Sequence, residues 1–191
     1  MKFNAHLDLQ GSHAFLSASQ YHWINYSDEK LDATYLTRIA AAKGTELHNF
    51  AAEAIRLGIK LQASRATLNK YVNDCIGFGM TAEQVLRYSD NAFGTADAIK
   101  FIAATKKNRP KLLVSDLKTG VTPTKFTQLM VYCAFFCLEY GFKPTELDFE
   151  LRIYQSDEVR FLEPEMDDIM HIMDRIITFD KRIEMLKAEV F

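Results

Sequence analysis

The apolar segment Phe126–Tyr140 constrains the fold of this chain more than any other part of the sequence. Its continuous hydrophobic run predicts a buried helix, and Gly141 and Pro144 are residues that end helices. Short apolar or alternating runs precede and follow it. A helix enclosed by strands in this way predicts an α/β fold with a mixed central β-sheet flanked by helices.

Two pairs of strands are expected around that helix. Tyr88–Ala104 and Lys111–Asp116 are short apolar or alternating runs, and the polar connection between them contains Pro110, which predicts a β-hairpin. Leu147–Tyr154 and Val159–Leu162 predict two further strands joined by a polar turn. These four segments are the predicted sheet.

Helices are expected at both ends of the chain. Leu31–Leu57 predicts one long helix, or two helices with a break at Gly44, and Arg65–Asp74 predicts another. Glu165–Glu189 predicts a closing helix with a buried apolar side. That side comprises Ile169, Ile172, Met173, Ile176, Ile183 and Leu186.

A short helix is expected near the N-terminus. Ser17 is a suitable N-cap, because its hydroxyl can accept a hydrogen bond from a free backbone N–H. The helix would extend to Tyr26, with Tyr21 and Trp23 packed inward.

Length and composition favour one domain over residues 1–191. Its 191 residues with 48% hydrophobic content suffice for a substantial core. The 23 basic and 25 acidic residues give a net charge of -2, so any argument for nucleic acid binding must be local. The segments Ala54–Asn73 and Ala98–Ser115 contain basic residues and no acidic ones. Their basic side chains either contact the phosphates of a nucleic acid or form solvated faces.

The cysteines indicate a reducing compartment. Cys75, Cys133 and Cys137 form no CxxC motif and no paired framework. The N-terminal residues lack the pattern of a signal peptide, and no apolar run is long enough to span a bilayer. We therefore expect a soluble cytoplasmic protein with no membrane partner.

Two carboxylates and a lysine are expected to meet at one end of the hairpin. Asp97 lies in its first strand and Asp116 at the end of its second, so antiparallel pairing can bring them together. Lys118 follows two residues later, on the same face of an extended segment as Asp116. Paired carboxylates can hold a divalent metal, and an ammonium group can stabilise a phosphate transition state.

The order of these motifs resembles the PD-(D/E)xK nuclease superfamily, in particular its RecB-like branch. The residues that carry the resemblance are Gly94–Asp97 on one strand, Asp116–Lys118 on the next, and Gln128 with Tyr132 on the following helix. Upstream, Gly44–His48 matches the glycine-x-x-x-histidine motif of that branch. The resemblance extends over residues 44–132, about half of the chain.

The resemblance implies a metal site and a catalytic lysine. His48, Asp97 and Asp116 would bind Mg²⁺ or Mn²⁺ through their side chains, and Leu117 through its backbone carbonyl. Lys118 would be catalytic, with Asp97 and Asp116 in the reaction centre.

The resemblance also implies residues that contact the substrate. Gln128 and Tyr132 would bind the DNA backbone or orient the lysine, and Thr119 and Lys125 would add nucleic acid contacts. Some relatives carry four cysteines that bind an iron–sulfur cluster. This chain has Tyr26 near the first of those positions and no cysteine after Cys137, so we expect no cluster.

The function expected from the resemblance is that of a metal-dependent DNA exonuclease. It would act on DNA ends or single strands in recombination, repair or phage DNA metabolism, with DNA and a recombination or replication protein as partners. Two alternatives stay open. One is a non-catalytic nucleic-acid-binding or assembly subunit with the same fold, and the other is an unrelated α/β domain whose Asp97 and Asp116 lie far apart. The sequence leaves open the polarity of degradation, exo- versus endonuclease preference, DNA versus RNA as substrate, and the oligomeric state.

Overall fold

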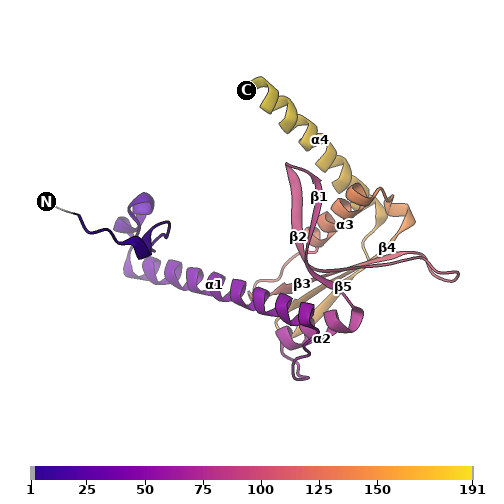
Figure 1. Cartoon of the computed structure of the whole chain (residues 1–191), viewed down its shortest axis with the longest axis horizontal. Coiled ribbons are helices and arrows are strands. Elements are labelled where there is room, and N and C mark those ends of the chain that lie inside the picture. Colours follow the sequence, from indigo (N-terminus) through magenta and orange to yellow (C-terminus); the bar gives the residue numbers. More distant parts are fainter. Residues whose placement is uncertain (1–2, 191) are drawn as a thin grey trace. The chain divides into compact units, whose positions relative to one another are not determined.

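The computed structural model describes residues 3–190, which form two compact units. The first unit ends at Lys43 and the second begins at Gly44, within helix α1 (Asp28–Leu57). The second unit continues with α2 (Thr67–Phe78), β1 (Thr81–Ser89), β2 (Ala92–Ile102), β3 (Lys111–Lys118), α3 (Thr127–Tyr140), the 3-10 helix η3 (Pro144–Glu146), β4 (Asp148–Gln155), β5 (Glu158–Leu162) and α4 (Met166–Val190) (Figure 1).

The five strands form one mixed sheet in the order β1-β2-β3-β4-β5. Strands β3 and β4 pair in parallel, and the other neighbours are antiparallel. A parallel pair needs a long crossover connection, and α3 lies in that connection. The predicted α/β fold with a mixed sheet and flanking helices is therefore confirmed.

Strand β3 is buried on both faces. Leu112 and Val114 belong to a core cluster with residues of α3 and α4. Leu113 and Leu117 belong to a second cluster with residues of α1 and α2. Because neighbouring side chains of a strand point to opposite faces, β3 joins the two cores and holds its last residues in a fixed place.

The predicted hairpin is confirmed, but one strand is absent from the prediction. Strands β2 and β3 pair antiparallel from Ala98 opposite Ser115 to Ile102 opposite Lys111, and their connection projects from the sheet (Figure 1). The run that was predicted to begin at Tyr88 contains a turn between β1 and β2. Strand β1 carries no clear alternation in its sequence, because exposed, half-buried and buried residues follow one another irregularly along it.

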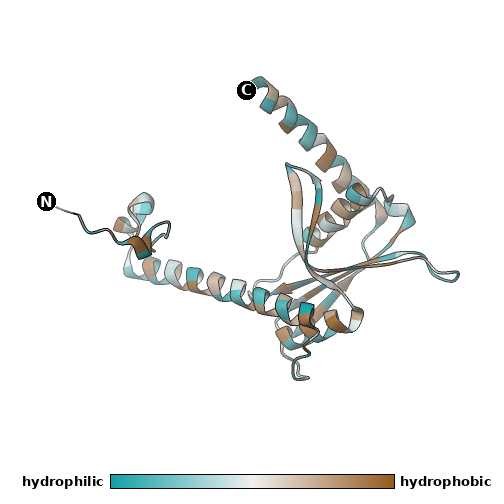
Figure 2. Cartoon of the chain, in the orientation of Figure 1, coloured by the Kyte–Doolittle hydropathy of each residue, from teal (hydrophilic) through white to brown (hydrophobic). Residues whose placement is uncertain are grey.

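Helix α4 is buried only over its first turns. Ile169 is fully buried, and Ile172, Met173 and Ile176 pack against the core. The prediction that Ile183 and Leu186 are buried is wrong, because their exposed fractions are 38% and 41%. Hydrophobic and hydrophilic residues both occur along these outer turns (Figure 2). Within residues 3–190, no helix combines the length and the hydropathy needed to cross a bilayer.

The N-terminal unit contains two 3-10 helices, η1 (Leu7–Leu9) and η2 (Ala18–Asn25), before α1. Ser17 precedes η2 as predicted, but its hydroxyl makes no capping hydrogen bond; instead its carbonyl accepts a 2.9 Å bond from Trp23 Nε1–H. Trp23 and Tyr26 are half-buried, whereas Tyr21 is 58% exposed, so its predicted inward packing is wrong. Helix α1 is continuous through Gly44.

Glycines end α2 and α3 in the left-handed conformation, Gly79 with φ of 63° and Gly141 with φ of 71°. A side chain is strained there, because its Cβ approaches the backbone. Gly77 lies inside α2, where a Cβ would meet no atom within 4 Å.

These two environments predict opposite effects of alanine. We expect Gly79→Ala to lower the free energy of unfolding by about 1 kcal/mol. Gly77→Ala should raise it by roughly 0.5–1 kcal/mol, because alanine favours the helix. Urea denaturation followed by circular dichroism measures both, and equal effects of the two substitutions would contradict the assigned end of α2.

Candidate metal centre

The candidate centre lies where β2 and β3 separate. Their paired register ends with Ala98 opposite Ser115, so Asp97 and Asp116 follow directly on adjacent strands. The alternative of an unrelated α/β domain predicts that Asp97 and Asp116 lie far apart. The register of β2 and β3 does not support this alternative. Asp97 is half-buried, and Asp116 is only 2% exposed.

Asp97 connects three elements of the second unit. Its Oδ2 accepts a 3.0 Å hydrogen bond from the backbone N–H of Leu117 on β3. The same oxygen lies 3.3 Å from Nδ1 of His48 on α1. The hydrogen bond to Asp97 raises the pKa of His48, against the opposing effect of burial. The predicted pairing of His48 with Asp97 is thus present in the geometry.

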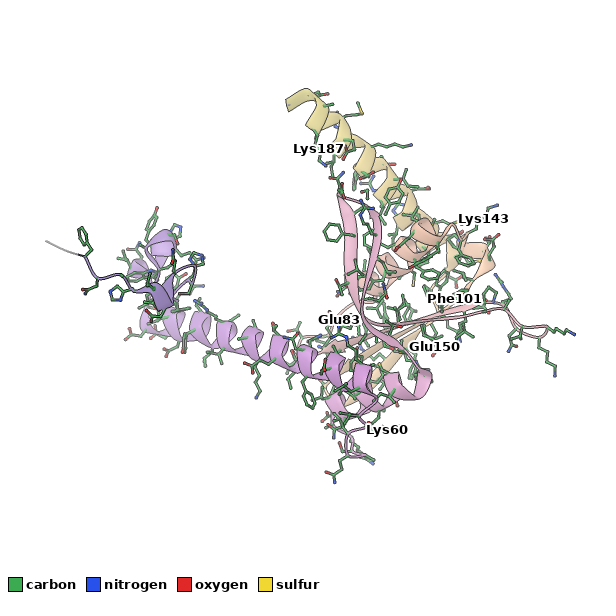
Figure 3. The ribbon with its side chains drawn as sticks, viewed as in Figure 1. Lys60, Glu83, Phe101, Lys143, Glu150 and Lys187 are labelled. Carbon is green, nitrogen blue, oxygen red and sulfur yellow. The ribbon has the colours of Figure 1, made fainter. Side chains whose placement is uncertain are left out.

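Glu83 of β1 completes a group that sequence analysis does not predict. Possible ligand atoms of His48, Glu83 and Asp97 all lie within 4.8 Å of one another (Figure 3 labels Glu83). Nitrogen and carboxylate oxygen together suit a first-row divalent metal. Burial is the main reason that the pKa of Glu83 is raised, and the charge of Asp97 adds to it.

The backbone at Glu83 is unusual for a strand. Its φ is 52°, a conformation that non-glycine residues rarely adopt. The pairing with β2 passes from Ala82 opposite Ala98 to Gln84 opposite Ala96, so Glu83 itself has no assigned partner. Strained residues of this kind are enriched at functional sites. In the sequence, the only sign that Glu83 belongs to the site is that it is acidic, and the prediction contains no separate strand at β1.

Asp116 lies outside this group of three and faces Lys118. Its Oδ2 is 3.0 Å from Lys118 Nζ, yet neither carboxylate oxygen receives a well-directed hydrogen bond from any described residue. Burial raises the pKa of Asp116 to about 6, and the charge of Asp97 contributes, whereas Lys118 and His48 act in the opposite direction. A buried carboxylate is a favourable environment for a cation, and here the ammonium of Lys118 lies beside it.

A chain of hydrogen bonds runs from Lys118 to helix α3. Lys118 Nζ donates to Gln128 Oε1 at 2.9 Å, and Gln128 Nε2 donates to Tyr132 Oη at 3.0 Å. Gln128 is exposed at the surface, whereas Tyr132 is buried. Spacing of four residues places both on one helical face. The arrangement orients the ammonium group between Asp116 and Gln128.

Two glycines of the predicted motifs lie where neighbouring elements approach closely. A Cβ on Gly44 would lie 2.9 Å from Thr119 Oγ1, which is closer than real Cβ atoms approach. A Cβ on Gly94 would lie 3.2 Å from a ring carbon of Tyr132. These glycines let α1 approach the end of β3, and let α3 approach β2.

The remaining predicted residues are placed as follows. Thr119 and Lys125 are exposed, and the side chain of Leu117 is buried in the core. In the basic hairpin segment, Lys111 pairs with Glu150 at 2.5 Å and Arg109 lies 3.7 Å from Asp148, so part of this charge is neutralised. Cys75, Cys133 and Cys137 are free thiols buried in the two cores.

Comparisons of the chain with protein-family models, curated proteins and solved structures found no match. The assignment of the centre therefore depends on its own geometry. His48, Glu83 and Asp97 can together hold a metal ion.

The burial of Asp116 predicts a pH-dependent stability. An aspartate in an unfolded chain has a pKa of about 4, whereas burial raises the pKa of Asp116 to about 6. The folded state therefore disfavours the ionised form, and stability falls as pH rises between these values. In EDTA, Asp116→Asn should raise the unfolding free energy on the order of 2 kcal/mol at pH 8 and far less at pH 4.

Chemical denaturation at several pH values measures this difference. Asp174→Asn, on the exposed side of α4, is the control and should have no pH-dependent effect. An equal effect of Asp116→Asn at both pH values would contradict the account.

Proposed function

We propose that the protein is a divalent-metal-dependent nuclease of the PD-(D/E)xK, RecB-like type that hydrolyses phosphodiester bonds in DNA. The strongest support is the convergence of His48, Glu83 and Asp97 from α1, β1 and β2 beside the Asp116–Lys118 ion pair of β3. These residues are far apart in the chain, so their convergence is a property of the fold.

The donor set fits the chemistry of phosphodiester hydrolysis. A divalent ion, when bound, would neutralise phosphate charge and lower the pKa of a water molecule. His48 and Asp97 would hold the ion, and Glu83 offers a third oxygen ligand. We propose that Asp116 joins this shell, since it is buried and the Lys118 ammonium, 3.0 Å from its Oδ2, is the partner that the structure gives it.

Lys118 would act on the phosphate or on the attacking water. Its ammonium group lies 3.0 Å from Asp116 and 2.9 Å from Gln128, so its position is fixed before substrate binds. A preorganised cation of this kind stabilises developing negative charge without further rearrangement. Gln128 and Tyr132 would keep that ammonium in place or contact the DNA backbone.

Removing the ammonium group should abolish cleavage. We expect Lys118→Ala to lower the rate on end-labelled DNA in Mn²⁺ at least about a hundredfold. Lys107→Ala, in the projecting β2–β3 connection, is the matched control and should retain cleavage. A gel assay on 5′- and 3′-labelled single- and double-stranded DNA and on a closed circle measures the rates and the type of end required. Cleavage by Lys118→Ala at the parent rate would refute the proposed role.

Metal binding should stabilise the folded chain by mass action. At a Mn²⁺ concentration one hundred times the dissociation constant, the expected gain is about 2.7 kcal/mol. Asp97→Asn should lose the resulting shift in melting temperature, whereas Asp174→Asn should keep it. Differential scanning fluorimetry with and without EDTA measures the shift. Stabilisation without any cleavage would favour the non-catalytic nucleic-acid-binding subunit, and no stabilisation would contradict the metal centre.

A further inference from the structure

A small cavity lies beside the candidate metal centre, where the chain leaves β3. Its volume is about 240 Å³. The residues that line it come from α1, the start of α2, the end of β3, the loop that follows β3 and the β4–β5 turn. They are Leu47, Thr67, Leu68, Leu117, Lys118, Thr119, Gly120, Val121 and Ser156.

The lining combines apolar walls with hydroxyl groups. Leu47, Leu68, Leu117 and Val121 provide the apolar surface, and threonine and serine side chains provide hydroxyls. The volume is below the range of roughly 300–1,000 Å³ that is typical for drug-sized ligands. A single planar ring system with polar edges therefore fits this cavity better than a whole nucleotide does.

A buried glutamine fixes one wall of the cavity. Gln155, which is 6% exposed, donates from Nε2 to the carbonyls of Gly120 at 2.6 Å and Thr122 at 2.8 Å. Its Oε1 accepts a 3.3 Å bond from the N–H of Thr124. The loop after Lys118 is thus held by the end of β4, and the cavity does not depend on substrate for its shape.

A second part of the lining is fixed by hydrogen bonds between Asp157 and Thr67, the first residue of α2. The Oδ1 atom of Asp157 accepts hydrogen bonds from Thr67 N–H at 2.8 Å and from Thr67 Oγ1 at 3.0 Å. A carboxylate at the first turn of α2 is favoured by the free N–H groups there. Both parts of the lining are therefore anchored by side chains, Gln155 and Asp157, that take no part in the metal centre.

Lys118 connects the cavity to the metal centre, since it lines the cavity and lies 3.0 Å from Asp116. Leu47 and Leu117 also line it, directly next to His48 and Asp116 in the chain. A cationic site for phosphate beside an apolar site for a ring matches the two chemical parts of a nucleotide. Apolar side chains hold unstacked bases in the pockets of other nucleic acid enzymes.

We propose that this cavity binds one unpaired nucleobase of a DNA strand whose adjacent phosphate lies at the metal centre. The inference rests on the proposed function and specifies its substrate as single-stranded DNA or a frayed end. A base in a duplex is stacked and paired on both sides, so it cannot enter the cavity without leaving the helix.

Binding of a fluorescent oligonucleotide tests this proposal without cleavage. The probe is a single-stranded DNA hexanucleotide that contains 2-aminopurine, titrated with the full chain in Ca²⁺. We expect the emission to change on binding to the parent protein. Val121→Trp should weaken binding about tenfold, within the range measured for loss of a base contact. Val121 is 86% exposed, so this substitution should leave the fold intact.

Two controls make the result specific. Val85→Trp replaces a 49% exposed valine of β1 outside the cavity and should bind like the parent. A hexanucleotide with an abasic site at the 2-aminopurine position should compete about tenfold less well than the intact one. The proposal is overturned if Val121→Trp binds as tightly as the parent, if the abasic strand competes equally, or if the parent does not bind the probe.

Cleavage in Mn²⁺, measured separately, distinguishes the two proposals. Base-dependent binding without cleavage would overturn the nuclease function and leave the base site supported. Cleavage that is insensitive to Val121→Trp and to abasic substitution would overturn the base site alone.

Discussion

The rest of the centre depends on the contacts that the carboxylate of Asp97 makes. It accepts a hydrogen bond from the backbone of Leu117 and lies within 3.3 Å of His48, so it joins β2, β3 and α1 in the second unit. Burial raises the pKa values of Glu83 and Asp116, and the negative charge of Asp97 adds to both shifts. Several carboxylates close together in a partly buried place repel one another, and a cation relieves this repulsion.

The sheet supplies a rigid base for this charge cluster. Strand β3 is buried on both faces and ends with Asp116, Leu117 and Lys118. Adjacent side chains alternate between faces, so Asp116 and Lys118 point towards the side opposite to that of Leu117. One strand end thus offers charge on one side and an apolar surface on the other.

Much of the fold is predictable from the sequence because its signals are local. The apolar run of α3, the glycine that ends it and the β2–β3 hairpin each depend on neighbouring residues. The prediction of buried residues fails where the partner is distant, as at Ile183, because periodicity shows an apolar side but not whether anything covers it.

The site is only partly predictable for the same reason. His48, Asp97 and Asp116 carry motif spacing, whereas Glu83 lies in a strand whose polar residues hide it. Its left-handed backbone and its position beside Asp97 arise from pairing with β2, which no local pattern encodes. The close approach of Thr119 to Gly44 is also visible only in three dimensions.

Anomalous X-ray scattering from crystals grown with Mn²⁺ tests the metal centre most directly. The account predicts a peak at about 2.0–2.2 Å from a ring nitrogen of His48 and a carboxylate oxygen of Asp97, with Glu83 or Asp116 as a further ligand. Substitution of Asp97 by asparagine should remove the peak. A fully occupied Mn²⁺ ion away from His48 and Asp97, or no anomalous peak at saturating Mn²⁺, would contradict the account.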